Sequence, residues 1–179
     1  GFDPEGMRYY RLPAKDFAQL LRDMKLTAVS GHYDLNRFMS TSIDDLKRYV
    51  DRSIEGAHAL GQEYITWPLL DEGDRTIERF KVAAERLNIA GETITKAKLQ
   101  LAYHNHDFEF VDQNGQIGYD IILKETDPAL VKLQIDLYWI AHGSKLTANE
   151  WFKRQPGRFV MWHVKDMHKV SRDYTAVGN

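Results

Sequence analysis

The sequence predicts an α/β protein whose fold is an incomplete (β/α)8 barrel spanning residues 1–179. Apolar runs of strand length alternate with amphipathic helical stretches, a pattern that produces a parallel sheet covered by helices. We count five such runs, whereas a full barrel has eight strands and commonly needs about 250 residues. We therefore expect a single partial domain that lacks the first strands and the last strand. A smaller doubly wound sheet is the alternative, but no glycine-rich phosphate loop supports it.

The first half of the chain carries the signals for two helices and two strands. Apolar residues at helical spacing mark one face of each helix. Hydroxyl side chains suit the start of a helix, and glycine suits its left-handed end. The expected elements are a helix over 15–25, a strand over 26–32, a helix capped by Thr41 or Ser42 and ended by Gly61, and a strand over 63–67 stopped by Pro68.

The second half continues the same alternation with shorter connections. An Asn-Gly pair and an Asp-Pro pair mark turns between the periodic segments. The expected elements are a long helix opened by Asp74 or Thr76, a strand ending at His104, a turn at Asn114-Gly115, a helix over 119–125, a strand ending at Asp136, a helix over 149–154 and a strand beginning at Phe159.

Composition narrows the classes of protein. Twenty-four Lys and Arg against 26 Asp and Glu give a formal net charge of −2, so no electrostatic reason exists to expect a nucleic-acid or membrane partner. The chain has no cysteine, which excludes disulfides and thiolate zinc sites. No apolar run is long enough to cross a bilayer. A cytoplasmic location is favoured, and an exported form stays open because a signal peptide can precede residue 1.

Three strand-length runs each end in a potential metal ligand: His104, Asp136 and His163. A parallel barrel gathers the C-terminal ends of its strands around one point, where its chemistry sits. Two imidazoles and one carboxylate at that point suit Mn²⁺ or Zn²⁺, with Mg²⁺ or Co²⁺ as alternatives. The competing interpretation is that these polar groups only satisfy buried hydrogen bonds. Hydrogen bonding alone is a better explanation for any single histidine than for the three residues together.

Two further residues near these ligands are candidates for catalysis. His106 shares a strand face with His104, and it can act as a second ligand, a proton carrier or a loop residue. Lys165 follows His163 by two positions, so its cation can stabilise an enolate or hold a hydroxyl oxygen. The alternative for Lys165 is a salt bridge to Asp107 or Asp136.

Four residues at strand ends are candidates for substrate binding: His32, Trp67, Tyr138 and Trp139. The aromatic faces of the last three can pack on sugar rings, although core or rim packing is the commoner use of such residues. His32 ends its own strand and can reach the mouth of the barrel, or it can be a surface loop residue. Asp107 and Glu109 can orient a metal-binding imidazole by accepting a hydrogen bond from its other ring nitrogen.

The same segments resemble a known family. The motifs are Leu-Ala-Tyr-His104-Asn-His-Asp-Phe-Glu-Phe110, Gln-Ile-Asp136-Leu-Tyr-Trp139 and Trp-His163-Val-Lys-Asp166. They are similar to segments of the sugar phosphate isomerase/epimerase family, within the xylose-isomerase-like TIM-barrel superfamily. Ala-Val-Ser-Gly-His32 and Asp173-Tyr-Thr-Ala-Val-Gly178 look like further family segments. The likeness covers nearly the whole chain.

This resemblance implies a TIM barrel with one divalent metal at its C-terminal mouth. Superfamily members commonly bind the metal through Glu, Asp, His and Glu on their last four strands. Asp136 and His163 match the middle pair, whereas His104 occupies the position of the first Glu. The last Glu belongs to a strand expected beyond Asn179. Because the two Glu residues also move protons in the epimerases, these departures argue against simple epimerase chemistry, and related members include dehydratases and lyases.

The function expected from the sequence is metal-dependent isomerisation, epimerisation or elimination on a sugar or keto-sugar through an enediolate. Its expected partner is a small-molecule sugar, and a homo-oligomer is compatible with the sequence. The alternatives are a metal-dependent hydrolase, an abasic-site endonuclease of the same superfamily and a non-catalytic sugar-binding barrel. A balanced charge without a basic stripe argues against the endonuclease.

Overall fold

The computed structural model describes residues 2–178 and centres on a five-stranded parallel sheet. Its strands lie in sequence order, each hydrogen-bonded to the next. They are β4 (Ser30–His32), β5 (Tyr64–Trp67), β6 (Gln100–His104), β7 (Val131–Asp136) and β8 (Phe159–His163). Sequential parallel order with helical crossovers is the arrangement of a (β/α)8 barrel, and this sheet forms a half-barrel. The predicted incomplete barrel is therefore confirmed.

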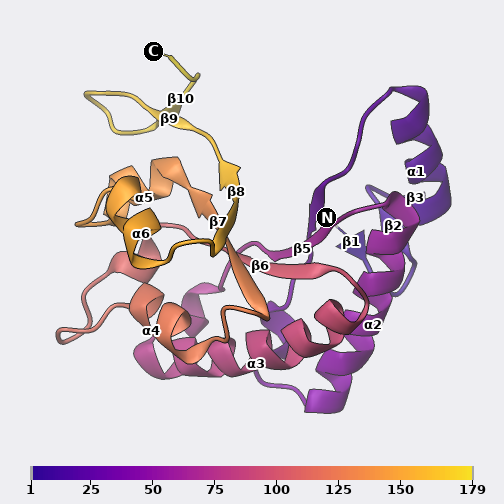
Figure 1. Ribbon diagram of the computed structural model, residues 1–179, viewed down its shortest axis with the longest axis horizontal. Coiled ribbons are helices and arrows are strands. Elements are labelled where there is room, and N and C mark those ends of the chain that lie inside the picture. The colour runs from indigo at the N-terminus through magenta and orange to yellow at the C-terminus, as the bar shows by residue number, and fades with distance from the viewer. Residues whose placement is uncertain (1, 179) are drawn as a thin grey trace.

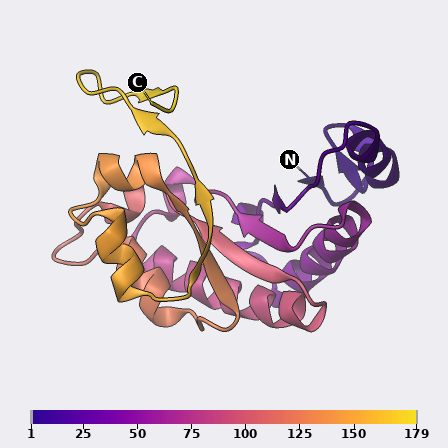
Figure 2. The ribbon, with the colours of Figure 1, turned by 45° about the horizontal axis from the view of Figure 1, so that its top comes forward.

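Helices cover the outer face of this sheet, as Figures 1 and 2 show. The three that lie together along this face are α2 (Ile43–Leu60), α3 (Ile77–Lys96) and α4 (Gly118–Glu125). Of the alternatives predicted for the start of α2 and α3, Ser42 accepts from the Asp45 N–H and Thr76 accepts from the Arg79 N–H, and Gly61 adopts a left-handed φ of 67°. Both helices therefore begin at a predicted cap residue, and α2 ends at its predicted glycine.

Two small substructures flank the half-barrel. An N-terminal antiparallel sheet of β1 (Phe2–Asp3), β2 (Arg8–Tyr9) and β3 (Leu12–Pro13) leads into α1 (Ala14–Asp23). At the other end, β9 (Asp166–Met167) and β10 (Tyr174–Thr175) form a hairpin beyond β8, at the yellow end of Figure 2. The sequence patterns predict α1 but neither antiparallel pair.

Two further helices follow β7, and one of them differs from the expectation. The predicted helix near 149–154 is α6 (Ala148–Arg154), with a complete capping box between Thr147 and Glu150. Before it lies α5 (Leu137–Gly143), which begins directly after Asp136. Tyr138 and Trp139, expected at a strand end, therefore lie in a helix. Three short 3₁₀ turns, η1 (Asn36–Phe38), η2 (Glu72–Asp74) and η3 (Phe108–Phe110), complete the connections.

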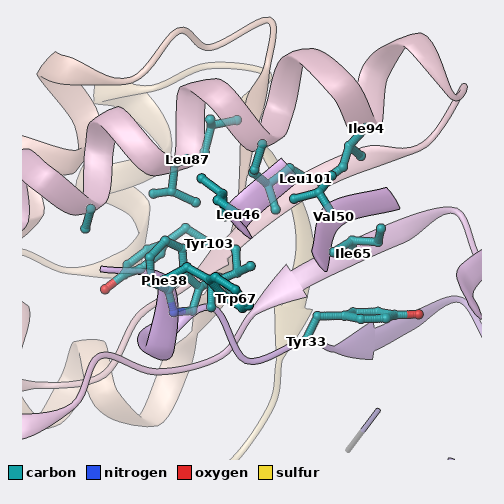
Figure 3. Close-up of a cluster of buried hydrophobic side chains, with 14 of the residues drawn as sticks. Tyr33, Phe38, Leu46, Val50, Ile65, Trp67, Leu87, Ile94, Leu101 and Tyr103 are labelled. Atoms are coloured by element: carbon teal, nitrogen blue, oxygen red, sulfur yellow. The ribbon is translucent and has the colours of Figure 1, made fainter. Parts of the chain in front are cut away.

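The hydrophobic core lies between the sheet and its helices (Figure 3). Trp67 and Leu101 from the strands pack with Leu46 and Leu87 from the helices, and all four are fully buried. Trp67 was a candidate substrate-binding residue, but its ring is completely inside this core, and its indole N–H donates to the Leu69 carbonyl at 2.9 Å. We therefore no longer expect it to contact a substrate.

Candidate metal centre

The three predicted ligands meet at one end of the half-barrel. His104 ends β6, Asp136 ends β7 and His163 ends β8. The strand register aligns these ends, because Asp136 lies opposite His163. One potential ligand atom from each residue falls within a group spanning 4.8 Å or less. The group could therefore hold a metal ion.

Asp136 is positioned by both the strand and the helix that follows. Its Oδ1 accepts a hydrogen bond from the Trp139 backbone N–H at 3.1 Å, which caps α5. Its own backbone N–H donates to Asn105 Oδ1 at 3.1 Å. These bonds turn Oδ2 toward the histidines, 3.2 Å from His163 Nδ1 and 3.6 Å from His104 Nε2. The carboxylate is fully buried, so it presents one oxygen to the site in a fixed direction.

The protonation state of His104 follows from its neighbour on β7. Its Nδ1 lies 2.9 Å from Gln134 Oε1, which is an acceptor, so Nδ1 carries the proton. The Gln134 amide nitrogen faces the Met161 sulfur at 3.7 Å, which supports this amide orientation. Burial, reinforced by the other histidines, lowers the pKa of His104 to about 2. The ring is therefore neutral at pH 7, with the Nε2 lone pair directed at the carboxylate.

This arrangement fits a divalent cation. A lone pair on His104 Nε2 and a carboxylate oxygen of Asp136 face each other without a proton between them. His163 Nδ1 is buried and makes no hydrogen bond within the described residues, although Asp136 Oδ2 is 3.2 Å away. Burial also lowers the pKa of His163, which favours the neutral imidazole that metals require. The donor set is the one predicted for Zn²⁺ or Mn²⁺.

Both candidate catalytic residues lie beside the three ligands. Lys165 Nζ donates to Asp136 Oδ2 at 2.8 Å and stands 5.5 Å from the centre of the Trp139 ring. This contact is the salt bridge that the sequence left as the alternative for Lys165. The His106 ring lies 4.9 Å from the His104 ring, and its Nδ1 is buried with no hydrogen-bond partner in residues 2–178. Burial lowers the pKa of His106 to about 4, so it is a neutral base at pH 7.

The remaining candidates for substrate binding differ in accessibility. His32, at the end of β4, is exposed and its ring lies 5.9 Å from that of His104. Trp139 is partly exposed and its ring lies 5.5 Å from that of His106. Tyr138 is buried, and its hydroxyl donates to the Arg172 carbonyl at 3.0 Å. Tyr138 therefore fastens the β9–β10 hairpin to α5, and of the four residues predicted to bind substrate, His32 and Trp139 are the accessible ones.

Glu109 plays a different part from the one expected. Rather than meeting an imidazole, its two carboxyl oxygens accept hydrogen bonds from the Tyr103 hydroxyl at 2.8 Å and the His106 backbone N–H at 2.9 Å. The side chain is fully buried, and burial raises the pKa of Glu109 to about 7. Glu109 thus fixes the backbone that carries His106. Asp107 instead faces His142, with Oδ2 3.2 Å from Nδ1.

Replacing Glu109 with Gln should change how stability depends on pH. The folded carboxyl holds its proton up to about pH 7, whereas the ordinary pKa is 4.5, so its stabilising contribution is complete below about pH 4.5 and is lost as pH rises through 7. Measured by chemical denaturation, the free energy of unfolding of Glu109→Gln relative to wild type should rise by up to about 3 kcal/mol from about pH 5 to pH 8. Exposed Glu63→Gln is the control; parallel pH profiles for wild type and Glu109→Gln would contradict this account.

Comparison with known proteins agrees with this architecture. The sequence profile described as xylose isomerase-like TIM barrel matches residues 2–176. The chain belongs to the xylose isomerase-like TIM-barrel family. The resemblance drawn from the three motifs is thereby confirmed. No curated protein shows significant sequence similarity to the chain.

Solved structures of several proteins share this fold. A sugar phosphate isomerase/epimerase from Parabacteroides distasonis ATCC 8503 is 24% identical with a TM-score of 0.83, over 98% of this chain and 66% of the other. A second from the same organism is 22% identical with a TM-score of 0.76, over 93% and 67%. The IolI protein, whose structure has a zinc atom, is 16% identical with a TM-score of 0.61, over 92% and 60%. The chain thus spans about two thirds of the length of the first two.

Within residues 2–178, none of the helices combines the length and the apolar character needed to cross a bilayer.

Proposed function

We propose that this barrel belongs to a divalent-metal-dependent isomerase or epimerase acting on a sugar or keto-sugar, with a dehydratase or lyase as the nearest related activity. The observation that carries the proposal is the meeting of His104, Asp136 and His163 at the C-terminal ends of adjacent parallel strands. Active sites of (β/α)8 enzymes lie at this end. The sugar phosphate isomerase/epimerases with the same fold support this substrate class.

A bound Mn²⁺ or Zn²⁺ held by these three residues would supply positive charge that acidifies the C–H bond next to a substrate carbonyl. The chain's own groups account for the proton and the orientation. Neutral His106 accepts the proton at Nδ1, which has no other hydrogen-bond partner among the described residues. Lys165 stabilises negative charge that develops on a substrate oxygen. The partly exposed Trp139 ring offers an apolar face to the C–H side of a sugar.

Features of the site weigh against the alternatives. An abasic-site endonuclease would bind a phosphodiester backbone, yet the chain carries a formal net charge of −2. In a non-catalytic sugar-binding barrel, a buried His106 Nδ1 with no hydrogen-bond partner among residues 2–178 would have no evident role. In a metal-dependent hydrolase, the metal would activate water rather than a C–H bond. Exchange of a carbon-bound substrate proton with D₂O therefore distinguishes an isomerase from a hydrolase.

The experiment that tests the proposal follows a carbon-bound proton. The protein, incubated in D₂O with a panel of keto-sugars, should exchange the proton next to the carbonyl when Mn²⁺ or Zn²⁺ is present, and chelation should stop the exchange. Proton NMR measures the loss of the C–H signal. Abasic-DNA cleavage or ester hydrolysis without exchange on any keto-sugar would contradict the proposal.

A further inference from the structure

We propose that Arg75 forms an anion-binding subsite at the mouth of the barrel, so that the substrate is a sugar bearing a carboxylate or a phosphate. This inference rests on the proposed function and specifies its substrate class. Arg75 lies in the connection between β5 and α3, which leaves the sheet at the end where the three ligands meet. The connection therefore brings a cation to the rim of the site.

The Arg75 side chain is held in place by a hydrogen bond from its Nε and by stacking of its guanidinium on an aromatic ring. Its Nε donates to the Leu70 carbonyl at 3.0 Å, and its guanidinium carbon lies 3.9 Å from the centre of the Phe108 ring. Gln113 fixes the backbone, because its amide donates to the Arg75 carbonyl and its oxygen accepts from the Ile77 N–H. A guanidinium held in this way loses little freedom when it binds a ligand.

The outer end of Arg75 is left without a partner. Neither Nη1 nor Nη2 makes a hydrogen bond, and no acidic side chain forms an ion pair with Arg75, within residues 2–178. The nearest acidic residue in sequence, Asp74, is paired with Arg79 at 2.5 Å. The two terminal nitrogens of a guanidinium form a planar fork that matches two oxygens of a carboxylate or phosphate. Arg75 thus has the free donors that an anionic group requires.

A row of aromatic rings links Arg75 to the metal ligands. The Phe108 ring lies under the guanidinium. The His106 ring is nearly parallel to the Phe108 ring, with an interplanar angle of 9° and 5.7 Å between ring centres. The centre of the His104 ring is 4.9 Å from that of His106. A sugar with its reacting carbons at His106 would extend its far end along these rings toward Arg75.

Binding measurements on the metal-loaded protein test this subsite. The probes are D-fructose, D-fructose 6-phosphate and D-glucuronate, measured by calorimetry. We expect at least one anionic probe to bind about tenfold tighter than D-fructose, and Arg75→Gln should remove that advantage while leaving D-fructose binding unchanged. Arg75→Lys should keep part of it, because the charge remains but the planar fork is lost. A preference for the phosphate or the carboxylate identifies which anion the substrate carries.

The matched control is Arg154→Gln. Arg154 also lies over an aromatic ring, that of Trp151 at 5.1 Å, but it is in α6 and exposed. It should leave all three affinities unchanged. If D-fructose binds and Arg75→Gln does not weaken either anionic probe, the subsite is refuted while the proposed function stands. If no probe binds and no keto-sugar exchanges its proton, both are refuted.

Discussion

Asp136→Asn should weaken the binding of Mn²⁺ and Zn²⁺ by more than about a hundredfold. Even the loss of a residue that only hydrogen-bonds to a metal ligand lowers metal affinity or activity about 10- to 100-fold. The substitution removes the negative charge of the group but leaves a side-chain oxygen able to accept from the Trp139 N–H, so the cap of α5 is preserved. It also leaves the Lys165 ammonium without its buried partner, which further opposes a cation at the site. Isothermal calorimetry measures the change directly.

Asp107→Asn provides the matched control for this experiment. Asp107 is a partly exposed carboxylate that faces His142 and is not part of the group of three ligands. Its substitution should leave metal affinity unchanged, and circular dichroism should report the same helix content for both variants. Equal metal affinity in Asp136→Asn and wild type would rule out Asp136 as a ligand.

His106→Ala should slow metal-dependent proton exchange by at least about a hundredfold, the usual contribution of a general base. The expected loss is in the chemical step because the three metal ligands remain in place. Metal affinity should therefore stay within about threefold of wild type. The exchange rate is followed by NMR on whichever keto-sugar responds, alongside a calorimetric metal titration.

His142→Ala tests whether this loss is specific. The His142 ring packs 5.6 Å from Trp139, so its removal disturbs the same aromatic neighbourhood, but its Nδ1 faces Asp107 rather than the metal ligands. We expect nearly normal exchange in this variant. Equal losses in both histidine variants would show that packing of the mouth, rather than proton transfer by His106, is what the substitutions remove.

Much of the fold could be predicted because the local signals agree with the tertiary structure. The helix caps at Ser42 and Thr76 form as the hydroxyl pattern predicts. The strand expected over 26–32 is shorter, beginning at Ser30, since β4 is at the sheet edge and pairs only with β5. Its hydrogen bonding to the segment that leads into β5 starts at the Val29 carbonyl, which accepts from the backbone N–H groups of Glu63 and Tyr64. An apolar run alone does not reveal where a pairing partner stops.

The convergence of His104, Asp136 and His163 was predictable because parallel strands in sequence order bring equivalent ends together. The helix after Asp136 could not be predicted, because the same aspartate ends β7 and caps α5, with no turn residue between the strand and the helix. The burial of Trp67 was also hidden, because a strand-end aromatic can face either the mouth or the helices. Arg75 gave no sequence signal, because its aromatic partner lies on another connection.

The position of a bound ion is the most direct test of the account. Crystals grown with Mn²⁺ should show an anomalous scattering peak about 2.0–2.2 Å from His104 Nε2, Asp136 Oδ2 and a ring nitrogen of His163. The same crystals of Asp136→Asn should show no peak there. A wild-type structure with Mn²⁺ elsewhere, and with Lys165 still the partner of Asp136, would contradict the central claim that these three strand ends form a metal centre.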